Sequence, residues 1–363
     1  MARVLLGMSG GLDSSVAALL LKQQGHEVIG MTIKTYSYED ISGSNPANDT
    51  SCCSLDGIND ARSVAMMLGI PHYVTDLTEE FGHEIIDYFK ETYLEGKTPN
   101  PCVKCNREIK WAAMLRKADA LGCEYISTGH YVDLREKNGR MVISRSKDSA
   151  KDQSYALWAV REEHFRRTLF PLSGLTKDEI RAIARDNHLP VAGKRESYEI
   201  CFVSDNDYRR FLRDNVPNID LKAPKGTFMF HDQVVGEHNG VPFYTIGQRK
   251  GLGLSLPTHP EPLYVTGLDV INNIVELGDD EELLTKQLTA RSVNMIKYAS
   301  LPNEGLAVTA KIRYKDEGAP AMAYPISDSE MRVEFESDRR AITPGQSVVL
   351  YEGNDVVGGG IIQ

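Results

Sequence analysis

The sequence predicts an α/β protein in three parts: a Rossmann-like domain with a parallel sheet, a small central β-rich module and a C-terminal β-barrel. In the first half of the chain, short apolar runs alternate with amphipathic helices, as in a parallel sheet covered by helices on both faces. From Lys225 onward, short alternating strands are separated by Gly, Pro and Asn, which is typical of an all-β structure. We therefore expect the domain over residues 1–205, the module over 206–280 and the barrel over 281–363.

Strands and helices are expected to alternate along the first domain. The strands are predicted at 4–8, 27–33, 71–76 and 124–128, and the helices at 14–24, 56–68, 79–94 and 107–120. A further helix within 175–190 has a marked start, because Thr176 and Glu179 form the pattern of a capping box. In a sheet of this kind, ligands bind at the carboxyl ends of the strands.

The second half predicts one more helix and then strands. The helix is expected at 208–215, and the strands lie within 226–232, 261–269, 272–278, 306–316, 331–337 and 347–363. Turn residues separate these strands at intervals of about ten residues, the spacing of a small sandwich or barrel.

The composition is that of a globular enzyme, with 41% hydrophobic and 25% charged residues. No apolar run approaches the ~20 residues that span a bilayer, and the first residues lack the apolar stretch of a secretory signal, so we expect a cytoplasmic protein. The net charge of −10 argues against indiscriminate nucleic-acid binding but is compatible with a local basic face. The six cysteines are too few for a disulfide scaffold, and we expect Cys52 and Cys53 to lie in an exposed loop without a catalytic role.

Residues 9–15, SGGLDSS, lie between the first predicted strand and the first predicted helix. The two glycines let an anion approach the backbone, and the serines add hydroxyl donors to the amides at the helix start. Asp13 would repel a bare phosphate, so we expect it to coordinate Mg²⁺ or to cap the helix. The alternative is a plain glycine turn with an Asp/Ser cap, but the double glycine and the run of hydroxyls after the first strand favour a phosphate site.

Two further stretches carry cysteines. In GKTPNPCVKCNREIKW (96–111), Cys102 and Cys105 precede a helix and are flanked by basic residues, which would lower a thiol pKa and favour a nucleophile. The same spacing is compatible with half of a metal site, and packing alone is the third interpretation. Cys201 lies in the apolar run YEICFV (198–203), where a lone cysteine is ordinarily a core residue.

The stretch GMSGGLDSS (7–15) resembles the PP-loop of the ATP pyrophosphatase superfamily, whose members cleave ATP between the α- and β-phosphates. Together with the cysteine stretches, further segments resemble the bacterial tRNA-specific 2-thiouridylase family over nearly the whole chain. These segments are STGHY (127–131), KDQSY (151–155), YTIGQRKGLG (244–253), IRY (312–314), TPGQS (343–347) and the terminal GGGII.

The resemblance implies specific roles. Cys105 matches the family's catalytic nucleophile, and Cys201 matches its persulfide carrier. The implied ATP site consists of Gly7, Met8, Ser9, Gly10, Gly11, Leu12, Asp13, Ser14, Ile33 and Gly129. The implied contacts to the target base are Asn100, Pro101 and Cys102, and those to the rest of the tRNA are His130, Lys151, Asp152, Gln153, Arg313, Tyr314 and Gln346. From the residues alone, His130 would be a core histidine, and Arg313 and Gln346 would be ordinary barrel surface.

The implied reaction is ATP-dependent 2-thiolation of the wobble uridine in the tRNAs for Lys, Glu and Gln. ATP and Mg²⁺ would be needed, with tRNA and a persulfide-carrying sulfur-relay protein as partners. Local basic clusters at 104–117, 166–167, 194–195, 209–213 and 249–250 would form a surface that follows the phosphates.

One departure from the family and three alternatives stay open at this point. Some family members have an aspartate with an acid–base role in place of Cys102, which puts that role in doubt here. Cys102, Cys105 and Cys201 also resemble the three-cysteine site of related sulfur transferases, which holds a 4Fe-4S cluster. The remaining alternatives are a PP-loop ligase for a small molecule and a non-catalytic RNA-binding protein.

Overall fold

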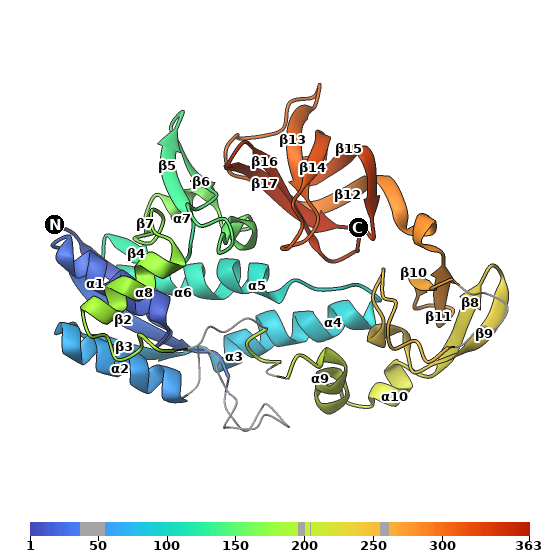
Figure 1. Ribbon diagram of the computed structural model, residues 1–363, viewed down its shortest axis with the longest axis horizontal. Coiled ribbons are helices and arrows are strands. Elements are labelled where there is room, and N and C mark those ends of the chain that lie inside the picture. Colours follow the sequence, from blue (N-terminus) through green and yellow to red (C-terminus); the bar gives the residue numbers. More distant parts are fainter. Residues whose placement is uncertain (37–54, 195–199, 204, 255–260) are drawn as a thin grey trace.

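The computed structural model describes residues 1–36, 55–194, 200–203, 205–254 and 261–363. The predicted loop with Cys52 and Cys53 lies outside these residues. Figure 1 shows three sheets arranged around a set of central helices, α4, α5 and α6, whose bounds are given below. Within the described ranges, no helix combines the length and apolar character needed to cross a membrane.

The first domain contains a five-stranded parallel sheet in the order β3-β2-β1-β4-β7. Its strands are β1 (Arg3–Gly7), β2 (Glu27–Lys34), β3 (His72–Asp76), β4 (Tyr125–Ser127) and β7 (Thr168–Leu169). In β1, Val4 and Leu6 pack into one hydrophobic cluster and Leu5 into another, as the two-residue period of a strand requires. Because the strand order reverses beside β1, the loop that follows β1 lies at the switch point where such sheets bind ligands.

Helices cover both faces of this sheet. On one face, α1 (Leu12–Gln23), α2 (Leu55–Leu68) and α8 (Lys177–Asp186) share the cluster of Val4 and Leu6. On the other face, α6 (Ala112–Ala120) shares the cluster of Leu5. The capping box predicted for α8 is confirmed, since Thr176 and Glu179 bond each other's backbone amides.

A helical stretch joins β3 to β4 and contains two widened turns. It comprises α3 (Thr78–Phe81), the π-helical η3 (Gly82–Asp87), α4 (Tyr88–Leu94), α5 (Pro101–Lys104), the π-helical η4 (Cys105–Trp111) and α6. The helix predicted at 79–94 is confirmed. The helix predicted at 107–120 begins earlier, at Pro101, because the Asn100 side chain caps it and proline is well suited to the first helical position.

A hairpin that the sequence did not predict follows β4. Its strands β5 (Asp133–Lys137) and β6 (Arg140–Ser144) extend the sheet of the C-terminal barrel through a pairing of Ser144 with Asp355. The buried Asp355 carboxylate accepts hydrogen bonds from Ser144 Oγ at 2.7 Å and Lys137 Nζ at 2.6 Å. Two short elements complete the segment, namely the 3-10 helix η5 (Ser154–Leu157) and α7 (Glu162–Phe165).

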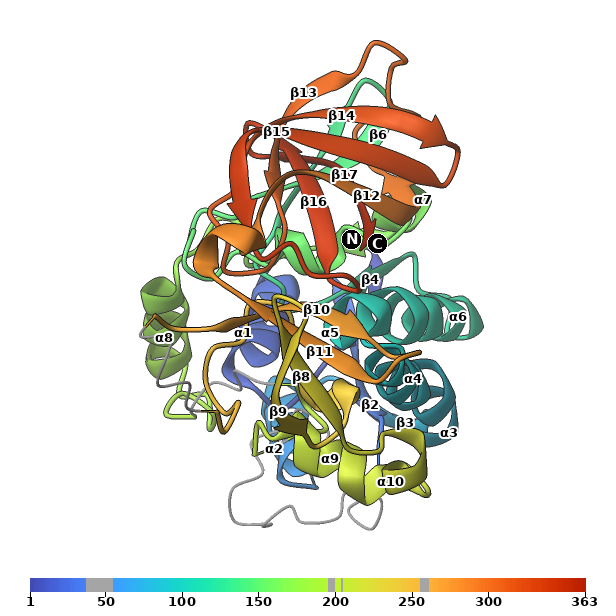
Figure 2. The same cartoon turned by 90° about the vertical axis from the view of Figure 1, so that its right-hand side faces the viewer.

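The central module has a four-stranded sheet in the order β10-β11-β8-β9. Its elements are α9 (Tyr208–Asn215), α10 (Ile219–Lys222), β8 (Gly226–Phe230), β9 (Gln233–His238), η6 (Val241–Phe243), β10 (Tyr264–Asp269) and β11 (Ile274–Gly278). Figure 2 shows this sheet below the barrel, beside the central helices. The predicted helix at 208–215 is confirmed.

The C-terminal strands form a closed barrel. They are β12 (Leu284–Met295), β13 (Leu306–Lys311), β14 (Ala319–Ser327), β15 (Glu330–Arg340), β16 (Ser347–Glu352) and β17 (Asp355–Ile362), after the 3-10 turn η7 (Asp280–Leu283). The order β12-β15-β14-β13-β16-β17 closes on itself because β12 also pairs with β17. The predicted fold class is therefore confirmed.

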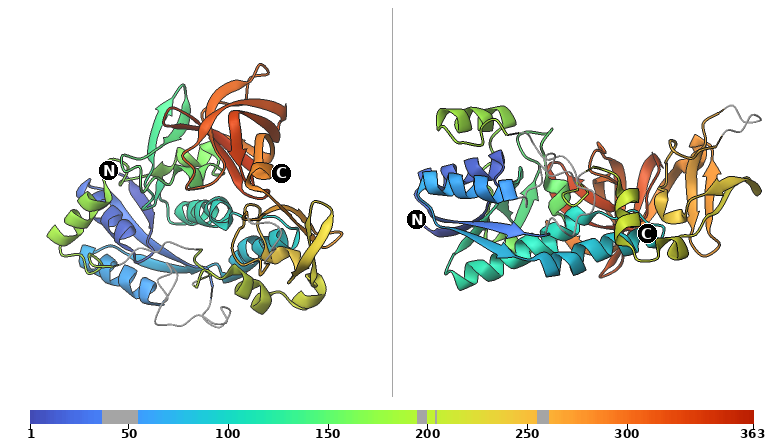
Figure 3. Two further views of the ribbon diagram at one scale, coloured as in Figure 1. Left: turned by 45° about the vertical axis from the view of Figure 1, so that its right-hand side comes forward. Right: turned by 90° about the horizontal axis from the view of Figure 1, so that it is seen from below.

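The terminal glycines bring the barrel against the first domain. A Cβ atom on Gly359 would lie 2.7 Å from the Trp158 ring, so only glycine permits this close approach. Asn294 of β12 donates its amide to the carbonyls of Trp158 and Val160 at 2.6 and 3.0 Å. The left view of Figure 3 shows the barrel above the central helices of the first domain.

Candidate active site

The loop between β1 and α1 has the shape of an anion site. Gly10 has φ of 68°, and a Cβ atom there would overlap the backbone of Gly57 in α2. Gly11 precedes α1 and provides no side-chain cap. The first amides of the helix, which form the positive end of its dipole, therefore face a possible ligand without a capping side chain. A glycine in this conformation before an uncapped helix start is what the sequence predicts for a phosphate loop.

The serine hydroxyls of this loop bond within it. Ser14 and Ser15 donate to the Gly11 carbonyl at 3.2 and 2.8 Å, and the Ser9 amide donates to Ser14 Oγ at 3.2 Å. The Gly11 amide faces Ser9 Oγ at 3.4 Å. Because the loop satisfies itself in this way, its backbone is preorganised before an anion arrives.

Asp13 has protein partners. Lys177 at the start of α8 donates to both of its carboxylate oxygens, at 2.7 and 3.0 Å, and the Tyr131 hydroxyl donates to Oδ1 at 2.6 Å. The Lys177 side chain is 9% exposed and that of Asp13 is 33% exposed, so the ion pair is shielded from water. This arrangement compensates the negative charge beside the phosphate loop and fixes the Asp13 carboxylate at the start of α1, while its Mg²⁺ contact stays a prediction.

Replacing Lys177 is expected to uncouple α8 from this loop. Lys177→Met should lower the free energy of unfolding by about 2 kcal/mol, because the partly buried Asp13 carboxylate loses its cation. Urea unfolding of Lys177→Met, Asp13→Asn and the double variant measures the coupling, with exposed Lys286→Met as the matched control. Additive effects of the two substitutions would contradict the pair's role.

The loop after β4 connects the phosphate loop to the cysteine-bearing helix. A Cβ atom on Gly129 would lie 2.9 Å from the Ser14 amide nitrogen, so this glycine packs directly on the start of α1. The ring of His130 lies 5.6 Å from that of Trp111 in η4, and Nδ1 is 2.9 Å from Thr128 Oγ1. Burial, together with the charge of Lys110, lowers the pKa of His130 to about 3, so its imidazole is neutral at pH 7.

The first cysteine stretch begins α5. The Asn100 side chain accepts a hydrogen bond from the Val103 amide at 3.4 Å, and Pro101 occupies the first turn. Cys102 is exposed, whereas Cys105 is buried at the start of η4. Widened helical turns are frequent at functional sites, and Cys105 is the first residue of this one.

Cys201 packs against the same hydrophobic cluster that contains Cys105. Tyr36, just beyond the end of β2, donates its hydroxyl to the Cys201 carbonyl at 3.0 Å. The neighbouring Phe202 is fully buried and meets the ring of Phe89 edge-on at 5.1 Å. The fold therefore brings the two sequence-distant cysteine stretches to one cluster.

The remaining predicted contacts lie at the junction with the barrel. Gln153 Oε1 accepts from the Tyr131 amide at 2.9 Å, and Asp152 Oδ2 accepts from Ser154 Oγ at 2.7 Å. Exposed Tyr314 donates to the Asp152 carbonyl at 3.0 Å. The other members of the predicted set are placed as follows: Ile33 near the end of β2, half-buried Lys151 in the turn before Gln153, exposed Arg313 in the turn after β13, and Gln346 just before β16.

Many cations of the predicted basic clusters are ion-paired. Lys104 pairs with Glu84 at 2.8 Å, and Arg166 pairs with Glu162 at 3.0 Å. A cavity of about 480 Å³ lies within the central module, between α9 and the segment over residues 239–251. It is lined by Asn206, Asp207, Tyr208, Arg209, Arg213, Asn239, Phe243, Tyr244 and Gly251. Because many of the cations are ion-paired, the net positive surface is smaller than the count of lysines and arginines suggests.

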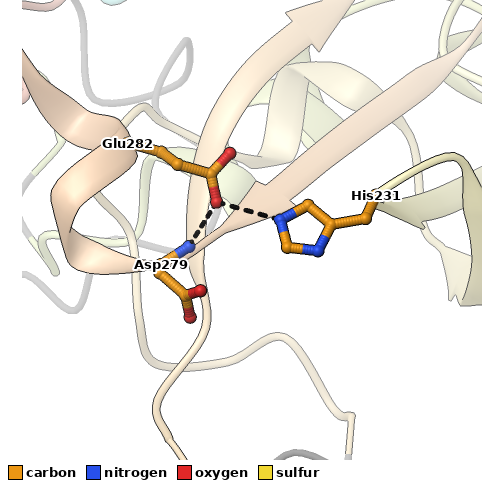
Figure 4. A group of neighbouring side chains, drawn as sticks. All are labelled: His231, Asp279 and Glu282. Atoms are coloured by element: carbon orange, nitrogen blue, oxygen red, sulfur yellow. Dashed lines mark hydrogen bonds and ion pairs between the residues drawn. The ribbon is translucent and has the colours of Figure 1, made fainter.

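One group of described residues has ligand atoms close enough for a metal ion, namely His231, Asp279 and Glu282 (Figure 4). Local structure accounts for it, because Asp279 and Glu282 form the capping box of η7 and His231 Nε2 lies 3.4 Å from Glu282. Among the residues that the structure describes, Cys102, Cys105 and Cys201 do not form such a group.

The structure thus joins the phosphate loop, Gly129 and His130 into one connected region, with the cysteines on the adjoining cluster. Sequence reasoning missed Lys177 and Tyr131 as partners of Asp13. The confirmed capping box at Thr176 marks the start of α8, but nothing in the sequence indicates that its first residue reaches α1.

Family models and similar proteins match this chain over nearly its whole length. Residues 2–205, 215–279 and 285–362 match three families, described as the tRNA methyl transferase HUP domain, the tRNA methyl transferase PRC-barrel domain and the aminomethyltransferase beta-barrel domain. The tRNA-specific 2-thiouridylase of Cytophaga hutchinsonii is 50% identical, over 99% of this chain and 97% of that protein. The tRNA-specific 2-thiouridylase of Amoebophilus asiaticus is 51% identical, over 99% of this chain and 95% of that protein.

Solved structures resemble the chain more distantly. The U34-tRNA thiolase of Methanococcus maripaludis, solved with its 4Fe-4S cluster, is 20% identical with a TM-score of 0.36, over 61% of this chain and 67% of that one.

Proposed function

This chain belongs to the family of tRNA-specific 2-thiouridylases, and on that premise we propose how its site replaces the 2-oxygen of the wobble uridine in tRNA with sulfur. The enzyme is an ATP-using sulfurtransferase that acts on tRNA uridine. The observation that carries the proposal is the meeting of the phosphate loop, the loop at Gly129 and the cysteine helix in one region.

The first step activates the uridine. Its 2-oxygen attacks the α-phosphate of ATP, the bond to the β-phosphate breaks, and pyrophosphate leaves with the electron pair. The amides of the first turn of α1 would hold the departing phosphates, because this turn follows β1 at the switch point of the sheet. Adenylation turns the carbonyl oxygen into a good leaving group.

The second step transfers sulfur. The terminal sulfur of a persulfide on Cys201 attacks C2 of the uridine, and AMP leaves with the former 2-oxygen. The Cys105 thiolate then attacks Cys201 Sγ, which forms a Cys105–Cys201 disulfide and releases 2-thiouridine with the electron pair of the broken S–S bond. A thiol reductant must reduce this disulfide before the next cycle. The location of both cysteines at one hydrophobic cluster supports this order of steps.

Other participants follow from this chemistry. A donor protein with its own persulfide would load Cys201, since the cycle consumes one sulfane sulfur per turnover. Mg²⁺ would enter with the phosphates of ATP, because the carboxylate of Asp13 is already bonded to Lys177 and Tyr131. No step is assigned to an iron–sulfur cluster, because the cycle balances with Cys105, Cys201 and a persulfide donor, and both cysteines lie at one cluster.

The test is direct. The protein is incubated with ATP, Mg²⁺, a persulfide donor and unmodified tRNA, and nucleosides are analysed by mass spectrometry. 2-Thiouridine is expected, together with pyrophosphate release that depends on tRNA. Release that is independent of tRNA would indicate a small-molecule ligase, and binding of tRNA without any ATP turnover would indicate an RNA-binding protein.

A further inference from the structure

The segment before α5 is held by both of the later parts of the chain. The Thr98 amide donates to the Pro344 carbonyl at 2.9 Å, so the barrel contacts the backbone of the first domain directly. Thr98 Oγ1 also lies 3.5 Å from Thr245 Oγ1 in the central module. Residues 98–100 therefore lie where the three parts meet, immediately before the cysteine helix.

Gln346 makes the most specific of these contacts. Its single Nε2 group donates to two consecutive carbonyls, those of Thr98 and Pro99, each at 3.1 Å. Gly345, with φ of 89°, lies so close that a Cβ atom there would be 2.7 Å from the Thr98 oxygen. The barrel turn thus fits the backbone of this segment closely, and no side chain is interposed at Gly345.

The segment fixed in this way leads directly to the reactive cysteine. Asn100 follows Pro99 and caps α5 through the Val103 amide. Cys105 comes at the end of the same helix, buried against the cluster that Cys201 also contacts. A shift of the two carbonyls would move the cap of α5 and, with it, the position of Cys105.

We propose that Gln346 is a positioning residue for sulfur transfer, which anchors the backbone at Thr98 and Pro99 and so sets the place of Cys105. The expected loss of thiolation rests on the proposed function, whereas the expected anchoring of the backbone at Thr98 and Pro99 does not. It is a role additional to the tRNA contact expected from the family resemblance, and it rests on the two hydrogen bonds that the Gln346 amide group donates within the protein.

The structural test uses hydrogen–deuterium exchange on the full-length protein without tRNA. Gln346→Glu keeps the shape of the side chain but removes both donors, and Gln346→Ala removes them without adding charge. Exchange in residues 97–105 is expected to accelerate about tenfold, as loss of two hydrogen bonds to a partly buried backbone allows. Exposed Gln287→Glu on the same barrel is the matched control and should leave this exchange unchanged.

The kinetic test separates positioning from tRNA binding. Both Gln346 variants should lower kcat for thiolation about tenfold, with KM for ATP and Kd for tRNA within twofold of the wild type. Unchanged exchange with weakened tRNA binding would overturn the proposal and make Gln346 an RNA contact. If the wild-type protein does not thiolate tRNA, the proposed function fails, while the exchange experiment still decides whether Gln346 anchors the segment.

Discussion

Cys201→Ser is expected to abolish formation of 2-thiouridine, at least 10³-fold, while tRNA binding stays within twofold of the wild type. Serine cannot carry the sulfane sulfur, yet it preserves the size of a side chain that is only partly buried against the cluster of Cys105. The measurement is nucleoside mass spectrometry after reaction with a persulfide donor, beside filter binding of the same tRNA. Thiolation that persists in this variant would remove Cys201 from the reaction.

Two further variants accompany this experiment, one to trap an intermediate and one as a control. Cys105→Ser blocks release of the product, so a covalent adduct between protein and tRNA should accumulate and should dissociate on addition of a thiol reductant. Cys123→Ala is the control, because Cys123 is buried in a separate cluster with Leu5 and Ile126, away from Cys105 and Cys201. It should retain thiolation.

Gly10→Ala is expected to eliminate tRNA-dependent pyrophosphate release and to lower the free energy of unfolding by about 3 kcal/mol. The added Cβ would overlap the backbone of Gly57, so either α2 or the phosphate loop must move. The residue would also be held at a φ of 68°, which alanine tolerates poorly.

Gly25 provides a matched control for this substitution. It has φ of 84°, but a Cβ atom there would meet nothing within 4 Å. Gly25→Ala should therefore lose only the conformational contribution of about 1 kcal/mol and should keep pyrophosphate release. Urea unfolding and a pyrophosphate assay on both variants give the comparison. Equal effects of the two substitutions would show that the contact between Gly10 and Gly57 contributes neither to stability nor to pyrophosphate release.

The sequence predicts the parallel sheet well because local patterns determine it. The alternation of Val4, Leu5 and Leu6 places both faces of β1 in apolar surroundings, and this is visible as an uninterrupted apolar run. The start of α8 is equally local, since Thr176 and Glu179 are three residues apart. The hairpin β5–β6 has a local signal in its Asn138-Gly139 turn, where both residues have positive φ, but its attachment to the barrel depends on Asp355, more than two hundred residues away.

The same distinction holds for the site. The positive φ of Gly10 is a local requirement that the double glycine indicates, whereas its close contact with Gly57 depends on how α2 packs on the loop. The pairing of Asp13 with Lys177 and Tyr131 depends on how α8 and the β4 loop pack on α1, across 164 and 118 residues. The π-helical turns also escape prediction, because apolar periodicity over a few residues does not distinguish η4 from an ordinary helix.

The anchoring of Thr98 by Pro344 and Gln346 has a consequence for biosynthesis. These partners are separated by 246 and 248 residues, so a growing polypeptide completes the parallel sheet and its phosphate loop long before the barrel turn leaves the ribosome. A product truncated before Pro344 would retain the sequence of the ATP-cleaving domain but would lack the anchor of its cysteine helix. Residues 344 and 346, which are translated long after the cysteine helix, thus make the placement of that helix depend on synthesis of the barrel turn.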